Sequence, residues 1–197
     1  MAKESMIVET KGLNRLAIEL KGFEKQIPGA AASALNRTLD FINTRIGRIV
    51  AQEYAIKTSD VKKTISKNKA RKGEISASLI SRGHTLSLSH FPFSPKQPGT
   101  SKRYVKVKIK KQGGYKTVNT DPKAFVQTMN NSLNVFKRVG PKRKPVVVLR
   151  TLSIPQMIDN TVVSSQVRQL AVDKLTERIT HEVSYRLDKA AKNMKKV

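Results

Sequence analysis

Few side chains in this sequence have the types and spacing that catalysis or metal binding requires. The three histidines, His84, His90 and His181, stand apart, and the six-residue interval between the first two is not a metal-ligand spacing. Segment 113–117 places a glycine pair before a Lys-Thr pair but lacks the first glycine of a P-loop, so it predicts a hairpin turn. The chain has no cysteine, which excludes thiolate catalysis, disulfides and Cys-ligated metals. We therefore expect no catalytic, cofactor or metal site.

Carboxylates are scarce where a polyanion-cleaving enzyme would need them. Residues 61–150 contain only Glu74 and Asp121, which are 47 positions apart. Paired acid–base chemistry and Mg²⁺-dependent phosphoryl transfer both need carboxylates that converge. An enzyme acting on polyanions remains an alternative, with acids supplied by the flanking helices. Metal-dependent DNA cleavage that is lost when Glu74 or Asp121 is changed would indicate it.

Positive charge is the dominant feature of the 197 residues. Lys and Arg number 39 against 14 Asp and Glu, so the net charge is +25. Residues 61–150 hold 22 basic and two acidic side chains, and the two ends are nearly balanced. A solvated basic face is one interpretation of this pattern. So dense a charge favours a chain that lies beside a polyanion or within an assembly.

The basic side chains most suited to meet an anion lie in a loop over 66–73 and in a hairpin over 103–118. Few aromatic residues accompany them, so we expect contact with phosphates, or with an acidic partner, and no base readout. Lysines that protect an edge strand from aggregation are an equally good explanation of the hairpin. The candidates are Lys67, Lys69, Arg71, Lys72, Lys102, Arg103, Lys106, Lys108, Lys110, Lys111 and Lys116.

Two long apolar seams predict the helices. A helix over 28–55 and another over 161–194 carry apolar residues at helical spacing, after a strand over 5–10 and a helix over 12–25. A short helix capped by Thr58 or Ser59 should follow the first long one. Only 38% of the residues are apolar, so we expect neighbouring subunits to contribute to the burial of the core. The seam residues predicted for subunit packing are Leu35, Leu39, Ile42, Ile46, Leu175, Ile179 and Val183.

The middle of the chain alternates with the period of a strand. Segments 75–80 and 86–89 predict strands joined at Arg82-Gly83, and 103–111 predicts a strand paired with 115–118. Further strands are expected at 134–139 and 145–150. Segment 91–102 predicts a proline-rich loop, and 121–132 has no single secondary-structure pattern. Residues 153–157 are expected to open the last element. The chain thus predicts an α+β fold and a single domain over 1–197, with a basic β-rich part at 73–150. Its mainly antiparallel sheet has about six strands, and the long helices pack on each other or on that sheet.

Neither a membrane span nor a signal peptide is expected. No apolar run approaches the ~18 residues of a transmembrane helix. The first residues are polar and include acids, unlike a secretory signal.

Several segments also follow the order of a known family. A helix opens on PGAAASALNR, and a phenylalanine-bearing strand, a strand ending in Arg, a Lys-Pro-Val strand and an Ile-Pro turn come later. These segments are 28–37, 124–127, 135–138, 144–146 and 154–157. Over about 28–190 the chain resembles the minor tail protein Z family, the tail completion or neck proteins of lambda-like tailed bacteriophages and prophages. The loop 91–102 departs from the family pattern.

The resemblance implies a structural virion protein without enzymatic activity. Such proteins form a ring, with sixfold symmetry, at the head-proximal end of the tail and surround the channel that carries the viral DNA. The implied partners are further copies of the chain, the tail terminator and tail tube proteins, the head-to-tail connector proteins and DNA. No membrane is implied, and assembly would take place in the host cytoplasm. A free protein that binds nucleic acid through its phosphate backbone is the alternative.

Overall fold

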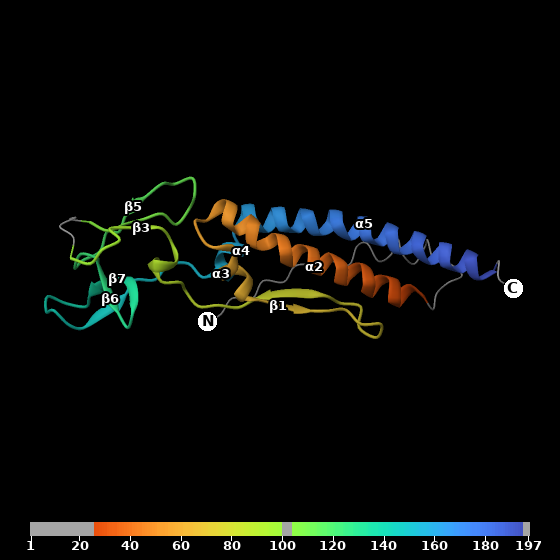
Figure 1. Ribbon diagram of the computed structural model, residues 1–197, viewed down its shortest axis with the longest axis horizontal. Helices are drawn as coiled ribbons and strands as arrows, with labels where there is room; N and C mark the ends of the chain where they lie inside the picture. The colour runs from red at the N-terminus through yellow and green to blue at the C-terminus, as the bar shows by residue number, and fades with distance from the viewer. Residues whose placement is uncertain (1–25, 100–103, 195–197) are drawn as a thin grey trace. The chain divides into compact units, whose positions relative to one another are not determined.

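Helices and antiparallel sheets together form the structure, which confirms the α+β class. The computed structural model describes residues 26–99 and 104–194 (Figure 1), so the elements expected at 5–10 and 12–25 lie outside it. The pairing is antiparallel as expected, but the number of strands differs from the predicted six, because the described residues form eight strands in three small sheets.

The chain divides into two compact units. Among the described residues, unit 1 comprises 47–64 and 82–160, and unit 2 comprises 26–46, 65–81 and 161–194. The boundary runs through a helix, between Ile46 and Gly47. That the two units form one domain stays a prediction.

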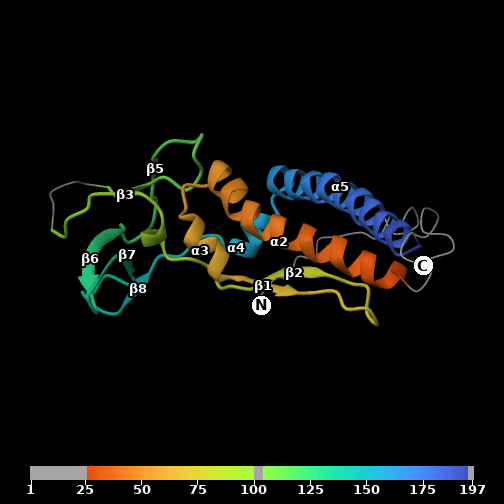
Figure 2. The same cartoon turned by 45° about the vertical axis from the view of Figure 1, so that its right-hand side comes forward.

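Unit 2 is built from two long helices and a hairpin. Helix α2 (Ile27–Glu53) contributes its first part and helix α5 (Thr161–Met194) its whole length. Strand β1 (Ile65–Asn68) pairs antiparallel with β2 (Ser78–Ser81). Helices α2 and α5 lie side by side and the hairpin follows α2 in both views (Figures 1 and 2). The bounds of α2 and α5 confirm the two helices expected from the apolar seams.

Small side chains dominate the contact between α2 and α5. Alanines of the first turns of α2, with Leu35, form one buried cluster with Leu175, Ile179 and Val183 of α5 and with Ala70 beside the hairpin. Asn36 joins the hairpin to the helix through two bonds: its Nδ2 donates to the Ala70 carbonyl at 2.9 Å, and its Oδ1 accepts from the Ala70 N–H at 2.8 Å. Of the two packings expected for the long helices, unit 2 therefore has the helix-on-helix one.

Unit 1 consists of short elements around two three-stranded antiparallel sheets. The helical elements are α3 (Thr58–Lys63), the 3₁₀ turn η2 (Leu88–His90) and α4 (Ile154–Ile158). The first sheet has the order β3 (Phe93–Ser94), β4 (Lys106–Val107), β5 (Lys116–Thr117). The second has the order β6 (Phe125–Met129), β7 (Ser132–Arg138), β8 (Val146–Val148). The predicted pairing of 103–111 with 115–118 and the strands near 134–139 and 145–150 are confirmed, although β4 is shorter than expected.

The predicted hairpin between 75–80 and 86–89 is wrong. Strand β2 pairs with β1, which lies in the segment expected to be a basic loop, whereas 86–89 leads into η2. The β1–β2 connection turns at Arg71 and Glu74, whose backbone groups exchange hydrogen bonds of 2.9 and 3.0 Å. Only Ile65 of β1 is half-buried and its other residues are exposed, so no alternation marks this strand in the sequence.

Other local predictions also need correction. The predicted cap of α3 is wrong, because the helix begins at Thr58, and its N-cap Lys57 makes no side-chain cap bond. Residues 153–157 do not open the terminal helix but the separate helix α4 (Ile154–Ile158), whose N-terminus has a capping box formed by Ser153 and Gln156. Strand β3 lies inside the proline-rich segment expected to be a loop.

The mixed segment 121–132 contains a regular hairpin. Strands β6 and β7 are joined by Asn130 and Asn131, with φ of 50° and 57°. Two positive φ values in succession define the tight hairpin turn that Asn tolerates better than most residues. The Asn-Asn pair was the available signal in the sequence.

In the described part of the chain, no helix combines the length and apolar character needed to cross a membrane.

Candidate anion-binding surfaces

The basic residues expected to meet an anion are divided between the two units. Those of the loop over 66–73 belong to unit 2, and those of the hairpin over 103–118 belong to unit 1. Lys102 and Arg103 lie outside the described residues. Unit 2 holds Lys67, Lys69, Arg71 and Lys72, and unit 1 holds Lys106, Lys108, Lys110, Lys111 and Lys116.

Two of the lysines in unit 2 contact a carboxylate of their own chain. Lys67 Nζ lies 2.7 Å from Asp40 Oδ1, and Lys69 Nζ lies 3.1 Å from Asp40 Oδ2. The hydrogen bond from Lys67, followed by that from Lys69, holds the pKa of Asp40 below its usual value. These two lysines fasten the hairpin to α2. Arg71 and Lys72, at the turn, are exposed.

Removal of this carboxylate should cost little, and in a pH-dependent way. We expect Asp40→Asn to lower the free energy of unfolding by about 0.5 kcal/mol at neutral pH, as for other exposed ion pairs. Because the folded protein lowers the pKa of Asp40, the stabilisation is complete above the usual value of 3.8 and is lost as pH falls through the folded value. Urea unfolding of both proteins between neutral and strongly acidic pH should show the difference closing. A constant difference would contradict this role of Asp40.

The β4–β5 hairpin of unit 1 keeps the expected alternation but not a free row of lysines. Val107 is buried and Lys106 is exposed. The register places Lys106 opposite Thr117 and Lys116 opposite Val107, so the two lysines lie on different faces of the ribbon. Lys110 Nζ lies 3.4 Å from Glu53 Oε1. Of the three alternating lysines, Lys110 is thus already paired.

Other cations of unit 1, not singled out from the sequence, lie over aromatic rings. Lys96 Nζ is 3.9 Å from the centre of the Phe93 ring, and Lys123 Nζ is 5.2 Å from that of Tyr104. Both distances are within cation–π range. Phe93 and Lys96 are three residues apart, whereas Tyr104 and Lys123 are 19 positions apart, so residue spacing could not have identified the second pair.

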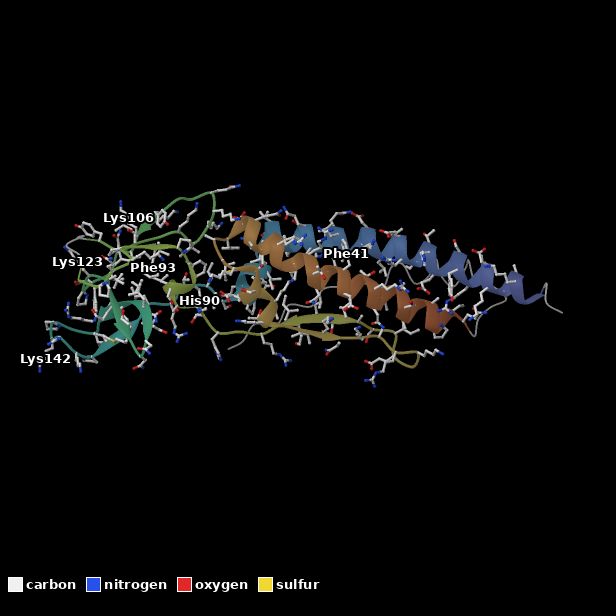
Figure 3. The ribbon with its side chains drawn as sticks, viewed as in Figure 1. Phe41, His90, Phe93, Lys106, Lys123 and Lys142 are labelled. Carbon is white, nitrogen blue, oxygen red and sulfur yellow. The ribbon has the colours of Figure 1, made fainter. Side chains whose placement is uncertain are left out.

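The loop between β7 and β8 is a further basic feature. Lys142, Arg143 and Lys144 are adjacent and exposed, and Figure 3 shows Lys142 on this loop. The run of three cations was its sequence signal. Over 82–160 the chain has 16 basic and two acidic side chains, so most of the net charge belongs to unit 1.

The candidate chemical residues do not assemble into a site. His84 and His181 are exposed, and His90 Nδ1 lies 3.4 Å from Asp60 Oδ2. The residues that the structure describes contain no group of three or more His, Asp or Glu side chains that could hold a metal ion. Gly114 has φ +62° and lies in the β4–β5 connection, which confirms the turn predicted over 113–117.

The residues predicted for subunit packing are all buried within the single chain. None is more than 7% exposed, and Leu35 and the three from α5 belong to the cluster that joins α2 to α5. The seven are Leu35, Leu39, Ile42, Ile46, Leu175, Ile179 and Val183. Their contact with a neighbouring subunit stays a prediction.

Comparison with known proteins assigns the chain to a class. The model of the prophage minor tail protein Z (GPZ) family matches residues 10–193, nearly the whole length, so the chain belongs to that family. It is a minor structural protein of a phage tail, and the resemblance found in the sequence is confirmed. No curated protein and no solved structure matches the chain.

Proposed function

We propose that this minor tail protein forms a ring of identical subunits, six by family resemblance, at the head-proximal end of the tail. The ring completes the tail late in assembly in the host cytoplasm and contacts the tail terminator, tail tube and connector proteins. Its basic surfaces adjoin the channel and contact DNA phosphates. The observation that carries the DNA part is the composition of 82–160, with 16 basic and two acidic side chains.

Unit 1 is suited to phosphate contact without sequence readout. Its cations include the exposed Lys106 and Lys116 and the basic loop at Lys142. Such side chains bind DNA by releasing condensed counterions, which requires neither a base contact nor a fixed register. A channel wall that DNA must pass has the same requirement, since strong base contacts would hold the genome in place.

The salt dependence of DNA binding tests this proposal. We expect the variant Lys106→Gln, Lys116→Gln, Lys142→Gln to bind a short duplex more weakly. If all three lysines contact phosphates, its log–log salt slope should be shallower by about 0.9 per contact. The matched control is Arg168→Gln, Lys189→Gln, Lys192→Gln, which removes the same charge from exposed positions of α5 in unit 2. Fluorescence anisotropy at several salt concentrations measures both.

Two results would overturn parts of the proposal. An unchanged slope, or equal losses in both triple variants, would exclude a specific role of unit 1 in phosphate contact and favour docking on an acidic protein. Sedimentation of the same preparation, and micrographs of particles lacking the protein, test the ring. DNA binding by a protein that is monomeric and absent from particles would favour the free nucleic-acid-binding alternative.

A further inference from the structure

Unit 1 contains a pocket of about 750 Å³ whose charged wall residues are all basic or histidine. Lys57, Lys96, Lys108 and Lys111 line it together with His90, and no carboxylate does. All of these residues belong to unit 1, so the pocket lies within one compact body.

Backbone hydrogen bonds join the segments that form the pocket. The N–H of Lys108 donates to the Pro92 carbonyl at 2.8 Å, and the N–H of Lys111 donates to the Glu53 carbonyl at 2.9 Å. The N–H of Ala55 donates to the Ile109 carbonyl at 2.8 Å. The wall is therefore formed before any ligand binds, which lowers the entropy cost of binding.

Most of the pocket lysines are not neutralised by the chain itself. No carboxylate of the described residues forms an ion pair with Lys57, Lys108 or Lys111, whereas the neighbouring Lys110 has Glu53 as its partner. The Nδ1 atom of His90 lies 3.4 Å from Oδ2 of Asp60. Three unpaired ammonium groups around one concavity favour an anionic ligand with more than one charge.

The apolar part of the wall decides between kinds of anion. Ile56 and Phe91, with exposures of 8% and 2%, lie in the wall beside Pro92. Since the Phe91 ring is buried, it cannot serve as a platform on which a base stacks. The phosphate groups of a duplex offer nothing apolar to place against the half-buried Pro92. A peptide that carries carboxylates on either side of an apolar side chain matches both parts of the wall.

We propose that this pocket binds an acidic peptide segment with an apolar centre, supplied by a neighbouring tail protein. The apolar side chain lies against Pro92, which is half-buried, and the flanking carboxylates contact Lys57, Lys108 and Lys111. The site depends on the established membership in a tail protein family and not on the proposed ring or its contact with DNA.

A labelled synthetic peptide of Asp and Glu with Leu-Phe at its centre tests the site by fluorescence anisotropy. We expect Lys57→Glu with Lys111→Glu to weaken binding at least about tenfold, or about 1.4 kcal/mol. Both residues are exposed, so the substitutions should not disturb folding, which thermal unfolding checks. The matched control is Lys142→Glu with Lys144→Glu, which changes the net charge equally at exposed positions of unit 1 outside the pocket.

Peptide and DNA controls complete the experiment. Replacement of Leu-Phe by Ser-Ser, or of the acids by their amides, should each weaken binding to the unsubstituted protein. The proposal would be overturned if the unsubstituted protein did not bind the peptide, or if the two double variants lost the same amount of affinity for it. If duplex DNA displaces the peptide, and the variant with Lys57→Glu and Lys111→Glu no longer binds that DNA, the pocket is a phosphate site instead. The DNA experiment with Lys106, Lys116 and Lys142 can fail while this one succeeds.

Discussion

Leu175→Asp should destabilise the protein by about 4 kcal/mol or more, enough to unfold unit 2. Leu175 is 4% exposed and lies in the cluster with alanines of α2 and with Ile179 and Val183. The substitution removes a buried leucine side chain and places a carboxylate in an apolar cluster, where it loses its hydration. Urea or thermal unfolding followed by circular dichroism measures the loss.

The same helix provides a control for this substitution. Val172 is 54% exposed on α5, so Val172→Asp should change the free energy of unfolding by less than about 0.5 kcal/mol. If the two variants were equally stable, the assignment of the α5 face that meets α2 would be wrong. In particles, Leu175→Asp should also be absent from tails, because a protein that does not fold cannot be incorporated.

Glu182→Gln should lower the free energy of unfolding by about 2 kcal/mol. Glu182 is 4% exposed, and its Oε1 accepts a hydrogen bond of 2.5 Å from Ser33 Oγ. Arg37 Nε lies 3.6 Å from Oε1, and Arg186 Nη2 lies 3.5 Å from Oε2. Glutamine keeps the shape and an acceptor for Ser33 but leaves both arginines without their counter-charge. Equilibrium urea unfolding measures the change.

Glu177 provides the contrasting case. Lys174 Nζ lies 2.6 Å from its carboxylate, closer than either arginine is to Glu182, but the Glu177 side chain is 59% exposed. Its hydrogen bond with Lys174 lowers the pKa of Glu177, but solvent screens the pair. Glu177→Gln should therefore have a much smaller effect than Glu182→Gln. A larger effect at Glu177 would show that distance, and not burial, determines the energies of these pairs.

The candidate sites were only partly predictable from the sequence. Composition identified the excess of cations, and alternation placed Lys106, Lys108 and Lys110 on the face of the strand opposite Val105, Val107 and Ile109. Neither composition nor alternation showed that Lys67 pairs with Asp40 or Lys110 with Glu53, since each of these contacts joins elements that are distant in sequence. The pocket was missed for the same reason. Its lysines come from the start of α3, the segment after β3 and the segment after β4, and no local pattern joins them.

The sequence by itself determined the two long helices, their apolar seams and the family to which the chain belongs. Helical periodicity depends on residues three and four positions apart, so it can be read locally. Only the tertiary structure decided that β1 pairs with β2, that the strands form three sheets, and which cations remain unpaired. Strand partners and ion pairs depend on distances between segments far apart in the chain. An exposed strand such as β1, with one half-buried residue, leaves almost no trace in the order of its residues.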